Sequence, residues 1–165
     1  MNPQKEQICI QDIAHSLSLL CRANGHCRHF YSVAQHCVNC AKEAKARGFS
    51  PRVQLACLLH DGSEAYISDI TRPVKKHLKQ YIEIEKNLQE QVYERFLFRP
   101  LSEEEIEQIR QIDDDILIWE FKTIMARTIE GTMPSMKSNP VFGFIPFEEV
   151  EKKFMEIYQE NKELV

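Results

Sequence analysis

The stretch LACLLHDGSEAYISD, residues 55–69, places charged groups where a buried helix face is expected to continue. Five apolar residues run directly into His60 and Asp61, and Glu64 and Asp69 follow closely. Burying polar groups of this kind is strongly unfavourable unless other groups pair with them. The stretch therefore requires a partner for these side chains, and the rest of the chain has to supply or hold it.

The chain around this stretch has helical periodicity, and no five-residue window alternates well enough to indicate a strand. Ser50 followed by Pro51 marks the start of a helix expected over residues 50–66. Ser32 is expected to cap the preceding helix, which Gly48 ends, and His36 lies on the apolar stripe of that helix.

Further helices are expected over residues 80–98, 102–126 and 147–164. Ser102 and Glu105 form a capping box at the start of the second of these. Residues 131–146 contain Gly, Pro and Ser and indicate an irregular connection. These patterns predict an all-α protein, a single compact helical bundle over residues 1–165 with a core over about 12–125 and a C-terminal loop and amphipathic helix over about 131–163.

Length and composition restrict the possible functions. A chain of 165 residues with 43% hydrophobic residues corresponds to one domain with a sizeable core. A net charge of −4 and a pI near 5.9 argue against a nucleic-acid duplex as partner. The N-terminal residues do not have the pattern of a signal peptide, and no apolar run reaches the roughly 18 residues that span a bilayer. We therefore expect a cytoplasmic protein without membrane association.

Six cysteines raise the question of disulfides or a thiolate metal site. Without a secretory signal, reduced core thiols are the expected state. Cys37 and Cys40 have the CxxC spacing, but no second pair accompanies them and their helix phase directs them into the core. A cysteine metal site is therefore not expected.

An acidic residue interrupts the apolar stripe of the helix expected over 102–126. Asp113 lies four residues after Ile109 and three before Ile116, and so shares their helix face. Asp114 and Asp115 are rotated from it by about 100° and 200°, so the three carboxylates cannot all face inward. Taken alone, a solvated acidic turn is the simpler interpretation. The expected stripe comprises Ile106, Ile109, Ile116 and Leu117.

Three helices thus present inward polar groups: His36 on the first, His60 with Asp61 on the second, and Asp113 on the third. Each has an ordinary explanation by itself, as a hydrogen-bonded core histidine or as an aspartate at a helix end. One divalent cation would satisfy all four together. Two imidazoles and two carboxylates suit Mn²⁺, Co²⁺, Fe²⁺, Ni²⁺ or Zn²⁺. A divalent metal is therefore the expected partner of residues 60–61.

The order His36, His60–Asp61, Asp113 resembles the HD-domain metal-dependent phosphohydrolases, which are helical proteins that hold a divalent ion through H…HD…D. The strings GHCRHFYSVAQH (25–36), LLHDGSEAYISDITRPVK (58–75) and IRQIDDDILIWE (109–120) are similar to those of compact bacterial and phage hydrolases related to 5′-deoxynucleotidases. The resemblance covers about residues 12–125. In that subgroup a Glu follows the last ligand by seven residues, which selects Asp113 with Glu120.

The resemblance also implies roles outside the metal ligands. Glu64 would orient or deprotonate the attacking water, and Asp69 would accept a hydrogen bond from the sugar. Arg22 is the best match to an arginine that contacts phosphate, and His26 is a further candidate. Lys75 would pair with an anionic substrate, with a solvated lysine as an equal alternative.

Two positions depart from the pattern of the family. Ala23 offers no aromatic ring where relatives have one beside the arginine, which leaves the preference for sugar or base open. Gly62 stands where Ala is more usual after the HD pair, and we expect this change to matter little.

The activity that the resemblance implies is metal-dependent hydrolysis of nucleoside 5′-monophosphates, foremost deoxyribonucleotides, with Asp61 and Glu64 as catalytic residues. The alternative is a non-catalytic protein that senses a nucleotide or binds a partner and keeps a structural metal. An HD-type iron oxygenase ranks last, because the remaining histidines do not supply an evident second set of ligands. A homodimer formed through the C-terminal amphipathic helix is also considered.

Overall fold

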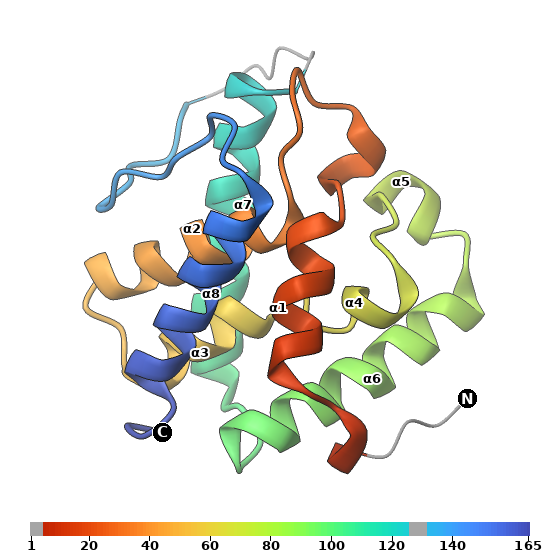
Figure 1. The fold of residues 1–165 in the computed structure, drawn as a ribbon, viewed down its shortest axis with the longest axis vertical. Coiled ribbons are helices and arrows are strands. Elements are labelled where there is room, and N and C mark those ends of the chain that lie inside the picture. The colour runs from red at the N-terminus through yellow and green to blue at the C-terminus, as the bar shows by residue number, and fades with distance from the viewer. Residues whose placement is uncertain (1–4, 126–131) are drawn as a thin grey trace.

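The computed structural model describes residues 5–125 and 132–165, and over these residues the chain is a bundle of α-helices (Figure 1). Within these ranges the only β-structure is a pair of isolated bridges, so the all-α prediction is confirmed. The predicted helix end at residue 126 and the start of the predicted loop at residue 131 lie outside the described residues. The elements in chain order are η1 (Lys5–Gln7), α1 (Ile10–Leu19), η2 (Arg22–Gly25), α2 (Val33–Ala46), α3 (Pro51–Leu59), α4 (Glu64–Ile67), α5 (Arg72–Lys75), α6 (Lys79–Leu97), α7 (Glu103–Thr123) and α8 (Phe147–Asn161).

The predicted helix starts are confirmed by their hydrogen bonds. The Ser32 side chain accepts a hydrogen bond from the Gln35 N–H at the start of α2, and Ser50 does the same for α3. Both halves of the capping box are present at Ser102. The end of α2 is also as expected, since Gly48 follows it with a φ of +77°, which favours glycine.

Helices α2 and α3 form the centre of the bundle. They pack on each other, and both contact α7 and α8. Figure 1 shows α8, in blue, lying across α2 and α3, and α6, in green, also packs against α3. Leu55, Leu58 and Leu59 of α3 are fully buried, and each such side chain contributes about 1.5–3 kcal/mol of hydrophobic stabilisation. His36 thus lies on one of the two central helices, and His60 and Asp61 directly follow the other.

The first helix was not among those predicted from the sequence. Ile10, Ile13 and Leu17 of α1 are buried against α2 and α8. Their spacing of three and four residues is the helical signal that was missed.

The C-terminal helix is packed into the same core. Val150, Phe154 and Ile157 of α8 are buried, and α8 contacts α1, α2 and α3. A homodimer through α8 would therefore have to use the opposite face of this helix. None of the described helices has the length and apolar character needed to cross a membrane.

The single helix predicted over residues 50–66 is wrong in its second half. Helix α3 ends at Leu59, the chain turns over residues 60–63, and α4 begins at Glu64. A Cβ at Gly62 would lie 2.9 Å from the Leu59 carbonyl oxygen and 3.0 Å from Val92 of α6. Close contact with this carbonyl and with the Val92 side chain therefore favours glycine, so the change from the more usual Ala is not neutral, contrary to our expectation.

The predicted stripe on α7 needs a smaller correction. Ile106 is 52% exposed, whereas Ile109, Ile112 and Ile116 are buried. The stripe is shifted toward Ile112, which lies next to Asp113 in sequence. The described residues include all six cysteines, and every one is a free thiol, with Cys37, Cys40 and Cys57 buried.

Candidate active site

The four predicted metal ligands meet at one point between α2, α7 and the turn that follows α3. His36 Nε2 is 3.1 Å from His60 Nε2 and 3.1 Å from Asp113 Oδ1. Asp61 Oδ2 lies 3.4 Å from His60 Nε2 and 3.9 Å from His36 Nε2, and Asp113 Oδ1 lies 3.7 Å from His60 Nε2. The structure thus brings together four donor atoms from three parts of the sequence.

The hydrogen bond that each imidazole makes at Nδ1 determines whether its Nε2 atom can act as an acceptor. His36 Nδ1 is 2.6 Å from the Glu120 carboxylate, and His60 Nδ1 is 2.7 Å from the Cys57 carbonyl oxygen. A carbonyl and a carboxylate only accept, so both Nδ1 atoms donate. In the neutral rings, both Nε2 atoms therefore present lone pairs to each other and to two carboxylates. Such a set of four acceptors fits a divalent cation, and the bonds at Nδ1 orient the rings for it.

Electrostatics lead to the same conclusion. Burial alone would lower the pKa of His60, but Asp61 and Asp113 raise it well above the usual value. Burial would raise the pKa of Asp113, but hydrogen bonds from His36 and His60 hold it well below the usual value. The two carboxylates thus favour positive charge at this site. In the metal-free protein this charge is carried by protonated histidines, and a bound cation would supply it instead.

Arg22 and Glu120 lie against the four donor atoms on the buried side. Arg22 Nε is 3.0 Å from Glu120 Oε2, its Nη1 is 3.1 Å from Asp61 Oδ2, and its Nη2 is 3.6 Å from Asp113 Oδ1. Glu120 is fully buried. The predicted phosphate-binding arginine is therefore placed at the site, with its guanidinium already engaged by three carboxylates.

Glu120 is expected to support both metal binding and acid stability. Burial acts to raise the pKa of Glu120, but Arg22 and His36 lower it from 4.5 to about 2. A lowered pKa means that the ionised carboxylate stabilises the fold above the unfolded value, and that this contribution is lost as the pH falls from 4.5 toward 2. We expect Glu120→Gln to lower the free energy of unfolding of the metal-free protein by about 1–3 kcal/mol at pH 7.

Denaturant unfolding at several pH values checks this expectation, with the exposed Glu163→Gln as control. The difference from wild type should shrink as the pH falls below 4.5, and metal affinity should drop by about 10–100-fold. A stability difference that stays constant from neutral pH down to pH 2 would contradict this role of Glu120.

Glu64 lies close enough to Asp61 and Arg22 for their charges to act on its carboxyl group. It is buried, and its Oε2 atom has no hydrogen-bond partner among the residues that the structure describes. Burial, together with Asp61 and Asp69, raises its pKa to about 10, although Arg22 and Lys75 act in the opposite direction. A buried carboxyl with an unpaired oxygen next to the donor atoms is suited to hold a water molecule.

Asp69, between α4 and α5, binds the loop that carries Arg22 and His26. Asp69 Oδ2 accepts a hydrogen bond from the Ala23 N–H at 2.8 Å. Ala23 and Asn24 have φ values of +54° and +51°, a strained conformation that this bond helps to hold. His26 is exposed at the end of η2, and within residues 5–125 and 132–165 no side-chain hydrogen bond joins it to the four donor atoms.

A pocket of about 390 Å³ opens beside the donor atoms and toward α6. His60, Asp61, Asp113 and Lys75 line it together with residues of α6. Lys75 is paired with Glu85, 2.5 Å away, so it is neither a solvated lysine nor an unpaired cation in this structure. The volume of this pocket is in the range of small-molecule sites, so the pocket is large enough for a substrate. Its lining includes both a cationic side chain, Lys75, and three of the expected metal ligands.

Two residues at this site were missed by the sequence analysis. Arg72 of α5 binds one of the four expected ligands, with Nη2 2.8 Å from Asp113 Oδ2 and Nη1 2.9 Å from Asp114 Oδ1. Gln89 of α6 accepts a hydrogen bond from the Ser63 N–H and donates one to the Leu59 carbonyl, and so braces both ends of the turn that carries His60 and Asp61. Neither has a local sequence signal, because each contact joins residues 26 or more positions apart.

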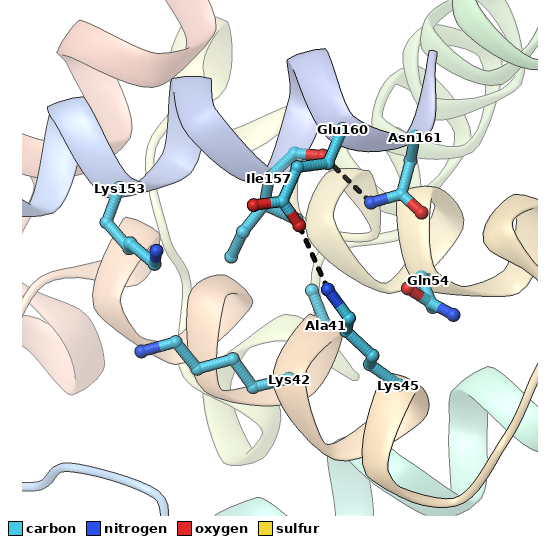
Figure 2. A pocket seen from close by; sticks show the side chains of 8 residues that line it. All are labelled: Ala41, Lys42, Lys45, Gln54, Lys153, Ile157, Glu160 and Asn161. Carbon is cyan, nitrogen blue, oxygen red and sulfur yellow. Dashed lines mark hydrogen bonds and ion pairs between the residues drawn. The ribbon is translucent and has the colours of Figure 1, made fainter. Parts of the chain in front are cut away.

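A second pocket, of about 190 Å³, lies elsewhere between α2, α3 and α8 (Figure 2). Lys42, Lys45 and Lys153 line it, and Lys45 is paired with Glu160 at 3.0 Å. Figure 2 shows no imidazole among its lining side chains, and its acidic group is already neutralised by Lys45. The chemistry of the protein is therefore expected at the larger pocket.

A helical bundle with a partly buried His/His/Asp/Asp donor set is typical of a class of divalent-metal hydrolases. The HD domain family model matches residues 21–161, and the chain belongs to this family, whose members are generally metal-dependent hydrolases. It is 39% identical over 97 residues to the uncharacterized protein YfdR of Escherichia coli K12, a match that covers 59% of this chain and 52% of YfdR. An uncharacterized protein of Rhodobacter capsulatus is 38% identical over 102 residues, with 58% and 52% covered. The chain spans about half the length of these relatives.

Proposed function

We propose that this protein is a metal-dependent phosphomonoesterase that removes phosphate from nucleoside 5′-monophosphates, foremost deoxyribonucleotides. The observation that carries the proposal is the convergence of His36, His60, Asp61 and Asp113 at one wall of a pocket of about 390 Å³. Membership of the HD domain family supports hydrolysis as the reaction class. The nucleotide as substrate comes from the resemblance of residues 25–36, 58–75 and 109–120 to the 5′-deoxynucleotidase group.

Four residues would hold the metal: His36, His60, Asp61 and Asp113. When bound, a divalent cation supplies Lewis-acid chemistry, because it withdraws electron density from a phosphoryl oxygen and acidifies water. Glu64 would hold the attacking water through its unpaired oxygen. With a cation bound, whose positive charge opposes the effects that raise the pKa of Glu64 to about 10 in the metal-free protein, the ionised Glu64 carboxylate would take a proton from this water. Asp61, three residues before Glu64 in the chain, would act with it as a catalytic residue.

The cationic side chains around the pocket would bind the phosphate. Arg72 and Lys75 are the accessible ones, since the Arg72 side chain is 61% exposed and Lys75 lines the pocket. Arg22 would stabilise charge from the buried side, where it also holds Asp61 in place. The free Oδ1 of Asp69 would accept a hydrogen bond from the sugar, while Oδ2 holds the loop at Ala23. His26 remains a further candidate for the phosphate if the loop over residues 22–28 closes on a substrate.

A panel of substrates tests the proposal. Protein stripped by chelation is assayed for inorganic phosphate release from ribo- and deoxyribonucleoside 5′-monophosphates, with Mn²⁺, Co²⁺, Fe²⁺, Ni²⁺ or Zn²⁺ added separately. We expect release that requires a metal, is greater for deoxyribonucleotides, and is absent in His36→Ala. A thermal shift by nucleotides without any release would support the nucleotide-sensing alternative, and release of phosphate only from other monoesters would overturn the nucleotide assignment.

A further inference from the structure

The buried wall of the four-donor site is lined by thiols. Cys40 lies one helical turn after His36 on α2, and it is buried. Its Sγ is 3.5 Å from His36 Nε2, the same nitrogen that faces His60 Nε2 at 3.1 Å. The sulfur and the two nitrogens all lie within 4.8 Å of one another. A sulfur donor thus stands beside both imidazoles, opposite the solvent-facing pocket.

The distances between these atoms match a tetrahedral metal centre. With metal–sulfur and metal–nitrogen bonds of about 2.3 and 2.0–2.1 Å, tetrahedral angles place sulfur and nitrogen about 3.5 Å apart and two nitrogens about 3.3 Å apart. The observed separations of 3.5 and 3.1 Å are close to these values. Asp61 and Asp113, whose oxygens lie 3.9 and 3.1 Å from His36 Nε2, remain available as carboxylate donors beside this sulfur.

We propose that Cys40 is a metal ligand of this protein together with His36 and His60, and that its sulfur makes the site prefer thiophilic ions, Zn²⁺ and Co²⁺, over Mn²⁺ and Mg²⁺. As the sulfur–metal bond forms, the S–H bond breaks and its proton passes to solvent. Softer donors select softer ions, so one thiolate is enough to shift the preference. The inference rests on the metal site of the proposed function, but not on phosphatase activity.

Cys37 is the other thiol near the site, and the structure distinguishes it from Cys40. The Cys37 sulfur and ligand atoms of His60 and Asp61 all lie within 4.8 Å of one another, and this set does not include His36. Cys57, on α3, is equally buried, and among the described residues it is in neither group of candidate ligands. Cys57 therefore serves as the matched control, because it is a buried thiol close to the same histidine, and Cys37 tests the rival assignment of the sulfur ligand.

The competing explanation treats Cys40 as a core residue whose S–H donates a weak hydrogen bond to His36. Burial favours a neutral thiol, since it raises the pKa of Cys40 well above the usual value. The two explanations differ in one property, because only a thiolate bound to Co²⁺ gives an intense sulfur-to-metal charge-transfer band in the near ultraviolet.

The experiment reconstitutes the metal-free full chain with Co²⁺ and records this band, and it measures Zn²⁺ and Mn²⁺ affinity by competition with a chromophoric chelator. We expect the band in wild type, Cys37→Ser and Cys57→Ser, and its loss in Cys40→Ser. Zn²⁺ affinity should fall at least about tenfold in Cys40→Ser, while Mn²⁺ affinity changes less than about twofold. Cys40→Ala serves as a second variant if the buried serine disturbs folding.

A wild-type protein without the band, a Cys40 variant that keeps it, or loss of the band in Cys37→Ser alone would overturn the inference. Because the readout is spectroscopic, the two proposals can fail separately. A protein that shows the band but releases no phosphate contradicts the proposed activity only, and an active phosphatase without the band contradicts the role of Cys40 only.

Discussion

Asp113→Ala should release the divalent cation and reduce phosphate release by at least about 10³-fold, since a bound metal contributes several kcal/mol to such reactions. Its Oδ1 is 3.1 Å from His36 Nε2 and 3.7 Å from His60 Nε2, so its loss opens one side of the donor set. The remaining groups then lose a shared partner as well. Elemental analysis of the purified variant and the phosphate assay measure the two effects together.

Asp114→Ala is the matched control for this prediction. Asp114 is the next residue on α7, but its carboxylate is exposed and bound to Arg72 Nη1 at 2.9 Å. Asp115 faces a third direction and pairs with Arg47 at 2.8 Å. We expect Asp114→Ala to keep its metal and most of its activity. If Asp114→Ala lost the metal and Asp113→Ala kept it, the assignment of the ligand would be wrong by one residue.

Glu64→Ala should keep the metal and bind nucleotide, yet lose turnover by about 10²–10⁴-fold, the usual contribution of a general acid–base group. Glu64 is buried, and its Oε2 atom has no partner among the described side chains and backbone groups, as expected of a residue that holds a water. Glu64→Gln keeps the shape, so an equal loss would assign the effect to charge and basicity. Single-turnover rates and metal content on the same preparations measure this, and an active Glu64→Ala protein would remove Glu64 from the mechanism.

Thermal stability separates this role from a structural one. The pKa of Glu64 is raised from 4.5 to about 10, so its favourable contribution to metal-free stability is complete below 4.5 and is lost as the pH rises toward 10. Glutamine does not titrate, and Glu64→Gln should therefore melt a few degrees above wild type at pH 7 and equal it near pH 4.5. A carboxylate paired with Lys or Arg predicts the opposite, a loss of stability at neutral pH.

The sequence by itself determined the helices with strong end signals and the residues that could be ligands. Ser32, Ser50 and Ser102 accept capping hydrogen bonds as predicted, because a cap involves only neighbouring residues. Asp113 was selected over Asp114 by helix phase, which depends on fixed rotation per residue, and the structure places Asp113 alone of the two among the donor atoms. The role of these residues as metal ligands stays a prediction until a metal is measured.

Tertiary structure decided what local rules do not contain. The turn over residues 60–63 exists because Gly62 packs against Val92 of α6 and Gln89 binds both ends of the turn. Arg72 reaches Asp113 across 41 positions, and the position of Cys40 beside His60 depends on how α2 packs on α3. Periodicity identifies which face of a helix is buried, but the groups that meet there are selected by long-range packing, which no sequence window spans.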